Sequence, residues 1–449
     1  MKTIFFTVFD GDIEKNLLQS DVLKTLKKAD IRIVLLMKHG LLKRYAHFQT
    51  DNVIVEELPP SNCFSERLFY WMGWNVIPTY SIYMRRYETY LKNRNIPQYI
   101  AGRILGIAGQ FRFFRNVLRF VYARIPDEYA AHFFETYQPD LLFAPSMFSF
   151  EDGRLLRMAK RRGIKTVTNS KSWDVLTNKA FTRVRADKIL VQNETIRDAA
   201  ISHGDYAAEQ VEIVGFVQFD YVFDAESLTS RADFFTKIGA DPAKKLILYS
   251  TSGDWKNPFD DEVVQGIHDA IVQGTIEEPA QILARFHPKY PSKIERLNLP
   301  FLIKDRPCVD EGAEDSLDGV TDKVYSFSFT RDDWSHLANS LYHSDVTVNT
   351  LSTITLDAIA FDKPVVLISH DGFDRVFPYW RALRRTYDET HFRDIVEADC
   401  TKVGHSMHET IDAIRLYLTN PHEDAVARKK VRDQYLYGLD GHAGERIAR

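Results

Sequence analysis

The chain of 449 residues has 45% hydrophobic and 27% charged residues and a formal net charge of −4. This length predicts two domains of about 200 residues each, and the composition is that of an ordinary globular protein. The balanced charge argues against nucleic acid as a partner. No window approaches the ~18 uninterrupted apolar residues of a membrane-spanning helix.

Cysteine usage and the opening residues favour a cytoplasmic location. The three cysteines, Cys63, Cys308 and Cys400, are widely spaced and form neither a disulfide framework nor a metal-binding pattern, which suits a reducing compartment. The first residues, MKTIFFTVFDGD, combine a short apolar run with acidic residues. They predict a core strand and not a signal peptide.

The first half of the chain alternates strands and helices. Strands are predicted at Lys2–Phe9, Ile31–Leu36 and Val53–Glu57, with a turn at Gly11-Asp12 and a helix at Asn16–Lys28. The alternation resumes with strands at Asp140–Pro145, Lys165–Asn169, Lys188–Gln192 and Val211–Val214, and with helices at Asp152–Arg162 and Glu194–His203. This order predicts a doubly wound α/β domain on a parallel sheet.

An aromatic and arginine-rich stretch, about residues 63–126, interrupts that order. Its most basic part, Gly109–Arg124, lies in a run from Ala101 to Pro126 that has no acidic residue. Four arginines recur there, with aromatic and aliphatic residues between them: Arg112, Arg115, Arg119 and Arg124. Two interpretations stay open. The segment is a basic helix that lies on an anionic membrane surface, or it packs its aromatic residues on the first domain and leaves its arginines in water.

The second half starts a new α/β domain after a polar crossing at residues 224–244. Strands are predicted at Lys245–Ser250, Ala280–His287, Lys323–Phe329, Val346–Val348 and Val365–Ile368, with mostly helical sequence beyond Ser369. The acidic, glycine-containing Arg306–Thr321 predicts a mobile surface loop. We therefore expect two Rossmann-like doubly wound domains that face a cleft, residues 1–225 with the insertion and residues 226–449.

One βαβ unit, Ser344–Val366, has the pattern of a phosphate site. Its strand leads through the polar loop Asn349–Thr353 into a helix, and a helix N-terminus after a parallel strand suits an anion. Thr350, Ser352 and Thr353 are candidate donors to that anion or caps of the helix. Asp357, one turn later, is a candidate for a ribose contact. The structural alternative is an ordinary helix cap.

Two further strand ends of the second half carry residues that are candidates to bind a nucleotide-activated substrate, the donor of a transferred group. Ser252 and Gly253 follow the first strand, where a glycine allows the backbone to approach a phosphate. Arg285 and His287 close the next strand, and their cationic side chains suit the charge that builds on a leaving nucleotide. His287 is thus a candidate catalytic residue, held rigid by the proline that follows it.

The strand ends of the first half carry residues that are candidates to bind the acceptor, the molecule that receives the transferred group. Gly11 and Asp12 follow the first strand, and Trp173 suits stacking on a sugar. Asp152 and Asp174 are alternative general bases for an acceptor hydroxyl. The structural alternatives are an acidic helix start for Asp152, a buried indole for Trp173 and a turn for Asp174. No metal-ligand cluster is apparent, so we expect no cofactor.

These motifs together resemble the GT-B glycosyltransferase superfamily, and more closely the CDP-glycerol glycerophosphotransferase group and related surface-polysaccharide transferases. The resemblance covers the C-terminal half best and rests on Arg285–Pro288, Asp333, Leu337, Ser344-Asp345, Asn349–Thr353, Asp357, Lys363-Pro364 and Asp440–Ala448. In the N-terminal half it rests on Ser172–Asp174, Lys188–Gln192, Val214-Gly215 and Phe219-Asp220. The chain departs from that group because no histidine stands at a clear strand end between Lys2 and Tyr129.

A second resemblance is to bacterial sialyl- and Kdo-type transferases. It rests on Glu151–Gly153, His287-Pro288 and Ser352-Thr353, which occur in that order. It implies a CMP-sugar donor, with Asp152 as the base.

The resemblances imply an inverting, metal-independent glycosyltransferase of surface-polysaccharide assembly in the cell envelope. The donor is then a nucleotide-sugar, the acceptor a glycan or lipid-linked molecule, and the location the cytoplasm or the inner face of the cell membrane. Alternatives are a CDP-glycerol-type glycerophosphotransferase, a nucleotide-sugar 2-epimerase, and a non-catalytic nucleotide-binding component of the same assembly. An epimerase would need several acidic residues converging on the sugar.

Overall fold

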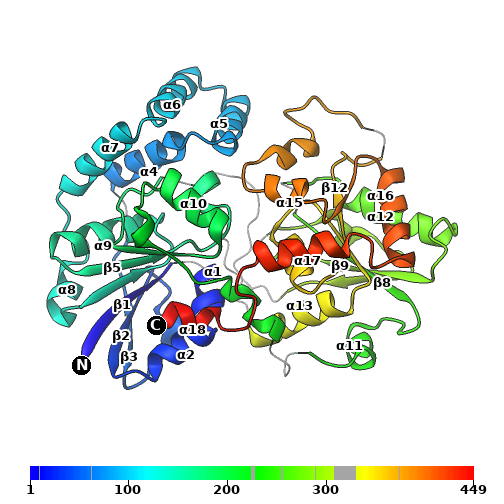
Figure 1. Cartoon of the computed structure of the whole chain (residues 1–449), viewed down its shortest axis with the longest axis horizontal. Coiled ribbons are helices and arrows are strands. Elements are labelled where there is room, and N and C mark those ends of the chain that lie inside the picture. Colours follow the sequence, from blue (N-terminus) through cyan, green and yellow to red (C-terminus); the bar gives the residue numbers. More distant parts are fainter. Residues whose placement is uncertain are drawn as a thin grey trace. The chain divides into compact units, whose positions relative to one another are not determined.

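A computed structural model describes residues 1–449 except residues 10, 62, 180, 224–227, 254–255, 289, 308–329 and 374. The chain divides into two compact units, Met1–Val217 with His442–Arg449, and Gln218–Gly441. Each unit is built on a parallel sheet with helices on both faces, which confirms the predicted fold class of two Rossmann-like α/β domains (Figure 1). The sequence predicts a division at 225/226, whereas in the structure the chain crosses after Val217 and its last residues return to the first unit.

The first unit holds a seven-stranded sheet in the order β3-β2-β1-β4-β5-β6-β7. Its strands are β1 (Lys2–Val8), β2 (Ile31–Met37), β3 (Val53–Glu57), β4 (Leu141–Ala144), β5 (Lys165–Asn169), β6 (Lys188–Val191) and β7 (Val211–Ile213). All neighbouring strands are parallel, so their carboxyl ends share one edge. The central strand β1 is buried on both faces: Phe6 and Val8 join one hydrophobic core and Phe5 the other.

The helices of the first unit cover both faces of its sheet. They are α1 (Gly11–Ile13), a π-helix (Glu14–Leu18), α2 (Asp21–Lys27), α3 (Leu42–Tyr45), α4 (Phe64–Val76), α5 (Tyr80–Asn93), α6 (Ile96–Ala108), α7 (Arg112–Arg124), α8 (Ala131–Tyr137), α9 (Phe150–Arg161), a second π-helix (Val175–Lys179), α10 (Glu194–Ser202) and α18 (Ala443–Ala448), with short 3₁₀ turns at Ala46–Phe48 and Ala208–Gln210. The C-terminal helix α18 packs on α2. The helix is also tied to the residue after β7, because the guanidinium Nε of Arg446 donates to the carbonyl of Val214 at 2.7 Å.

The region after β1 differs from its prediction. Gly11 and Asp12 open α1 and do not form a turn, and the predicted helix Asn16–Lys28 is broken. The break has a local cause, because the hydroxyl of Ser20 accepts a hydrogen bond from the backbone of Val22 and starts α2 anew.

The second unit holds a six-stranded parallel sheet in the order β10-β9-β8-β11-β12-β13. Its strands are β8 (Lys245–Ser250), β9 (Ala280–Arg285), β10 (Leu302–Asp305), β11 (Val346–Asn349), β12 (Val365–Ile368) and β13 (Lys402–Gly404). Its helices are α11 (Arg231–Ile238), α12 (Asp260–Val272), α13 (Arg331–His343), α14 (Thr353–Ala360), α15 (Arg393–Glu397), α16 (Met407–Thr419) and α17 (Ala425–Gln434), with 3₁₀ turns at Val217–Phe223, Lys293–Arg296 and Leu383–Asp388.

Two edge strands, β10 and β13, are not predicted from the sequence. Both are short, and neither has the apolar run of a central strand. The predicted strand Lys323–Phe329 and most of the predicted loop Arg306–Thr321 lie outside the described residues.

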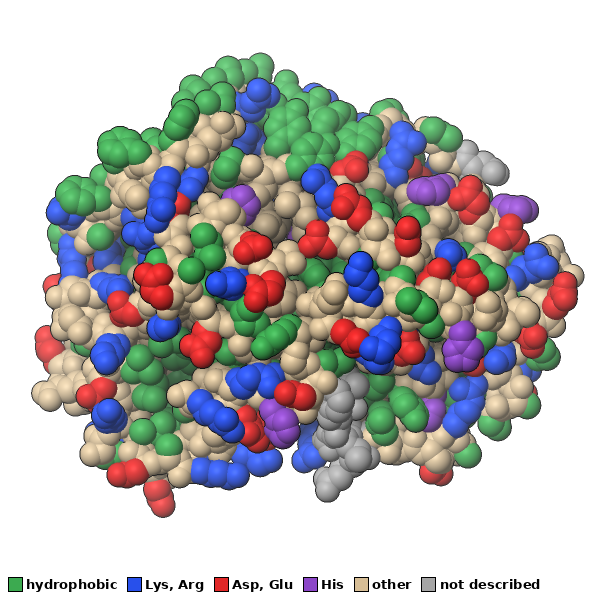
Figure 2. Space-filling view, viewed as in Figure 1, with side chains coloured by type: hydrophobic (Ala, Val, Ile, Leu, Met, Phe, Trp, Pro, Cys, Tyr) green, Lys and Arg blue, Asp and Glu red, His purple; other side chains and the backbone are tan. Residues whose placement is uncertain are grey.

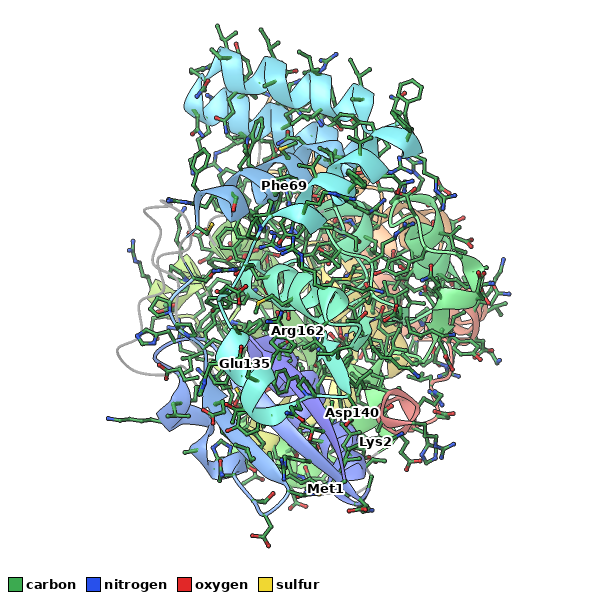
Figure 3. The ribbon with its side chains drawn as sticks, turned by 90° about the vertical axis from the view of Figure 1, so that its left-hand side faces the viewer. Met1, Lys2, Phe69, Glu135, Asp140 and Arg162 are labelled. Atoms are coloured by element: carbon green, nitrogen blue, oxygen red, sulfur yellow. The ribbon has the colours of Figure 1, made fainter. Side chains whose placement is uncertain are left out.

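The insertion of the first unit folds into the four helices α4–α7. Figure 3 shows them as a layer at the end of the unit opposite to Met1, with Phe69 of α4 inside that layer. In α7 the arginines Arg115 and Arg119 are buried, while Phe113 and Phe120 are exposed. The interpretation with packed aromatics and hydrated arginines therefore holds only in part. Phe114 packs on the core and Arg112 and Arg124 are exposed, but Arg115 and Arg119 bind a buried carboxylate on the body of the unit, that of Asp205.

Candidate functional site

The candidate site of the second unit lies where β9, β8 and β11 end. These strands are neighbours in the sheet and run parallel, so the loops that leave them meet at one edge. The three loops contain the sequence candidates Ser252 and Gly253 after β8, His287 after β9, and Thr350 after β11. The structure thus brings together residues that the sequence places about a hundred positions apart.

Two hydrogen bonds join the first two loops. The amide of Thr251 donates to the carbonyl of Arg285 at 3.0 Å. In return, the hydroxyl of Thr251 accepts from the amide of His287 at 2.9 Å. These bonds hold the backbone of His287 at the start of its loop, where the residue is half-buried.

Two side chains from the β8 loop join it to the β11 loop. The amide nitrogen of Asn257 donates to the hydroxyl of Thr350 at 3.2 Å. The ammonium of Lys256 donates to the carbonyl of Leu351 at 3.0 Å, two residues before α14. A positive charge therefore stands at the N-terminus of that helix.

A buried carboxylate, that of Asp260, holds the β8 loop in shape. It accepts from the phenol of Tyr249 at 2.6 Å, the side-chain amide of Asn257 at 2.7 Å and the backbone of Ser252 at 3.3 Å. Burial, together with this carboxylate, holds the pKa of Tyr249 well above its usual value, so the phenol stays a donor. Because the carboxylate of Asp260 accepts these three hydrogen bonds, its role is to hold the loop in place.

Gly253 takes a conformation that other residues rarely adopt. Its φ is +80°, and a Cβ built there would stand 2.4 Å from the Cβ of Tyr290. The ring of Tyr290 in turn contacts the imidazole of His287, with 4.7 Å between ring centroids. Only glycine fits this close approach of the loop to the residues after β9.

Two buried donors at these strand ends have no hydrogen-bond partner within the described part of the chain. They are the hydroxyl of Ser252 and the Nη2 of Arg285, whose residue is 4% exposed. The other terminal nitrogen of Arg285, Nη1, binds Asp305, which His336 also contacts at 3.1 Å. Burial alone would raise the pKa of Asp305, but the charges of Arg285 and His336 hold that pKa below its usual value. A buried donor without a hydrogen-bond partner costs about 1–3 kcal/mol of folding free energy. A ligand that accepts a hydrogen bond from such a donor therefore gains binding free energy.

The start of α14 offers further donors. Ser352 takes the extended N-cap conformation, yet its side chain makes no capping hydrogen bond, and Thr353 is exposed. The first-turn amides of a helix suit an anion. Asp357, by contrast, is buried and accepts from the phenol of Tyr221 at 3.2 Å. Its expected contact with a ribose stays a prediction.

In the first unit, Asp152 lies in α9 beneath the end of β1. It is fully buried, and its carboxylate accepts from the hydroxyls of Thr7 at 2.6 Å and Ser149 at 2.9 Å. The hydroxyl of Ser149 also caps α9. These contacts match the structural alternative, an acidic residue that stabilises a helix start.

The other first-unit candidates follow β5 and β1. Trp173 is 6% exposed, so most of its ring is packed inside the unit. Asp174 is half-buried and forms an ion pair with Lys179 at 3.1 Å. Gly11 and Asp12 are half-buried in α1. Their roles toward an acceptor stay predictions.

Three residues of the site, Lys256, Asn257 and Asp260, are not among the sequence candidates. The available signal was the polar run that follows Gly253 and enters α12, but its meaning depends on contacts with Thr350 and Leu351 that are remote in sequence. Across the described ranges, no group of three or more His, Cys, Asp or Glu side chains forms a metal site. Within the same ranges, no helix is long and apolar enough to cross a membrane.

The sequence matches no protein-family model and no curated protein. Solved structures do match over the whole chain. A Staphylococcus aureus MnaA–UDP complex aligns with a TM-score of 0.55 at 14% identity, covering 100% of this chain and 95% of that one. The UDP-GlcNAc 2-epimerase of Neisseria meningitidis bound to UDP-GlcNAc has a TM-score of 0.54 at 11% identity, covering 99% and 98%. CalG4, the calicheamicin glycosyltransferase, has a TM-score of 0.50 at 10% identity, covering 100% and 96%.

At these identities the likeness concerns the fold alone. It confirms the GT-B architecture that the sequence motifs predicted, which glycosyltransferases and UDP-GlcNAc 2-epimerases share. The likeness does not extend to one chemistry, since the same fold serves both reactions.

Proposed function

We propose that this protein is a metal-independent enzyme that transfers a sugar from a nucleoside-diphosphate donor to an acceptor hydroxyl. One observation carries the proposal: the three joined loops after β8, β9 and β11 gather cationic and donor groups at one edge of the sheet. These groups are the ammonium of Lys256, the imidazole of His287, the unpartnered hydroxyl of Ser252 and the start of α14. Such a set suits a diphosphate.

The proposed reaction needs this charge when the donor breaks. The bond between the anomeric carbon and the β-phosphate oxygen breaks, and the electron pair stays on the departing diphosphate. Lys256 and His287 stabilise the negative charge on the departing diphosphate. This charge is larger in the transition state than in the ground state, so the interaction lowers the barrier. The acceptor oxygen forms the new bond to carbon on the opposite face, and its proton passes to a carboxylate. Asp174 is the preferred base because it is partly exposed, whereas Asp152 is fully buried.

The 2-epimerase alternative uses the same kind of donor without an acceptor. It requires acid–base groups that remove and return a proton on the sugar. Of the two first-unit candidates, Asp152 is fully buried and occupied by Thr7 and Ser149, whereas Asp174 is partly exposed beside Lys179. One available carboxylate is enough for the single deprotonation of transfer, and epimerisation would need a second acid–base group.

The test follows the fate of the donor. The full chain is incubated with UDP-, dTDP-, GDP- and CMP-sugars, with and without oligosaccharide or polyprenyl-phosphate-linked acceptors, and the products are identified by mass spectrometry and NMR. We expect release of free nucleotide that depends on acceptor and is lost in His287→Ala. The matched control is His408→Ala, because His408 is exposed on α16 and contacts its helix neighbour Asp412.

Other outcomes separate the alternatives. An epimerised nucleotide-sugar formed without acceptor contradicts transfer and supports the epimerase. Turnover that survives unchanged in His287→Ala overturns the proposed role of this side chain. A CMP-sugar as the donor that is used supports the sialyl/Kdo-type alternative, and CDP-glycerol supports glycerophosphate transfer. Failure of every nucleotide to bind or react supports a non-catalytic role.

A further inference from the structure

Helices α6 and α7 present a continuous apolar face to the outside of the first unit. It is formed by Ile100, Ile104, Ile107, Phe111, Phe113 and Phe120, which are between 52% and 79% exposed. Figure 2 shows hydrophobic side chains gathered at the edge where Figure 1 draws these helices. We call these six residues the α6–α7 face. Soluble proteins rarely expose so many large apolar side chains together unless the surface binds something.

The packing of α6 forces its large side chains outward. The inward side of the helix carries Gly102 and Gly106, both buried. A Cβ at Gly102 would stand 2.6 Å from Oδ1 of Asn75, and one at Gly106 would stand 2.7 Å from Nη2 of Arg86. The helix therefore approaches α4 and α5 closely at its two glycines. Its Leu105 packs on the inner side as well, and Ile100, Ile104 and Ile107 lie outside.

The ion pairs of α7 also direct its large apolar side chains outward. Arg115 and Arg119 point inward and bind the buried carboxylate of Asp205 at 2.5 and 2.6 Å. Burial lowers the pKa of Arg119 to about 10, against the opposing effect of Asp205, so the guanidinium still carries its charge at neutral pH. With the arginines anchored inside, Phe113 and Phe120 project outward.

The surroundings of the α6–α7 face are basic. From residue 89 to residue 126 the sequence has no Asp or Glu. Lys92, Arg94, Arg103 and Arg124 are exposed there, and the guanidinium of Arg124 lies 3.2 Å from the ring centre of Phe120. Aromatic and aliphatic side chains surrounded by cations suit the boundary between lipid headgroups and acyl chains.

We propose that the α6–α7 face docks this protein on the surface of a bilayer that contains anionic lipids. Charge complementarity decides between a bilayer and a second copy. A two-fold dimer would place the same basic, acid-free surface against itself and bring like charges together. An anionic bilayer neutralises the arginines while it accepts the apolar side chains. This inference does not depend on the reaction proposed above.

The test measures partition of the full chain onto sucrose-loaded vesicles of phosphatidylcholine with and without phosphatidylglycerol. We expect binding to the anionic vesicles that weakens with salt. Replacing two of the outward rings in Phe113→Ser/Phe120→Ser lowers the partition coefficient at least about tenfold. Arg103→Gln/Arg124→Gln lowers it by about fivefold per charge on anionic vesicles only.

A matched control removes equally exposed apolar side chains elsewhere. Val376 and Val426 are 86% and 87% exposed, so Val376→Ser/Val426→Ser should bind vesicles like the unaltered chain. Circular dichroism checks that every variant is folded. Absence of vesicle binding, or equal binding by Phe113→Ser/Phe120→Ser, overturns the proposal. A concentration-dependent dimer in light scattering that this double variant dissociates, without vesicle binding, assigns the face to a second copy instead.

Discussion

The buried carboxylate of Asp205 is the anchor of α7, and its removal should strongly destabilise the first unit. It receives Nε and Nη2 of Arg115 at 2.8 and 2.5 Å and Nη1 of Arg119 at 2.6 Å. The two arginines are only 5% and 7% exposed. In Asp205→Asn both guanidiniums keep their charge but lose the opposite one, a situation that costs about 3–5 kcal/mol.

The retained amide oxygen of Asn can still accept one hydrogen bond, so we expect a loss near the lower end of that range. For a domain of 150–250 residues, about 3 kcal/mol corresponds to a fall of roughly 6–12 °C in the melting temperature. The assay is urea unfolding followed by circular dichroism, with limited proteolysis of α7 as a local probe. The control is Asp198→Asn, an exposed position on the neighbouring helix α10, which should change stability by no more than about 0.5 kcal/mol.

The pH dependence gives a second check on the same anchor. Burial by itself would raise the pKa of Asp205, but the hydrogen bonds from Arg115 and Arg119 hold that pKa below its usual value. The stabilisation is thus present above the unfolded pKa and is lost as the pH falls through the folded one. The difference between the unaltered chain and Asp205→Asn should shrink below about pH 4. A loss under ~1 kcal/mol at pH 7 would refute the anchoring argument.

Three further predictions concern the second unit. Gly253→Ala forces an unfavourable φ and a clash with Tyr290, so we expect a loss of ~1–3 kcal/mol in unfolding free energy and weaker nucleotide binding; an unchanged melting curve and affinity would contradict this. Lys256→Gln removes the hydrogen bond to Leu351, so we expect a loss of about 0.5–1.5 kcal/mol in stability and nucleoside-diphosphate binding weakened by about tenfold, measured by calorimetry; equal affinity would remove Lys256 from the site. Burial lowers the pKa of His343 and His370, so the unfolded state takes up protons first and stability should fall as the pH drops below 6.5; urea unfolding at pH 7 and 5.5 that shows no such fall would contradict it.

The sequence predicts the sheets well because their central strands are apolar runs with helices between them. It fails at β10 and β13, which lie at the sheet edge and lack that run. It also fails on the orientation of α7. The residue pattern shows that one side of the helix is apolar and the other basic, but it does not show which side is buried. That depends on Asp205, which lies 90 positions from Arg115.

The candidate site shows the same limit. Strand-end motifs placed Ser252, Gly253, His287 and Thr350 on one edge, because parallel strands have a fixed direction. The sequence does not single out Lys256, because the carbonyl that it contacts is 95 positions away. The acidic start of a helix and an acidic catalytic residue have the same short motif, so only the burial of Asp152 separates these interpretations.

The most direct test of the account is calorimetric titration of the full chain with UDP, CDP, GDP, dTDP and CMP. The account predicts that at least one nucleoside diphosphate binds, and that Lys256→Gln and Ser252→Ala each weaken its binding while the exposed-histidine variant His408→Ala does not. Absence of binding by all five nucleotides, or binding that neither site variant changes, would contradict the claim that the loops after β8, β9 and β11 form a diphosphate site.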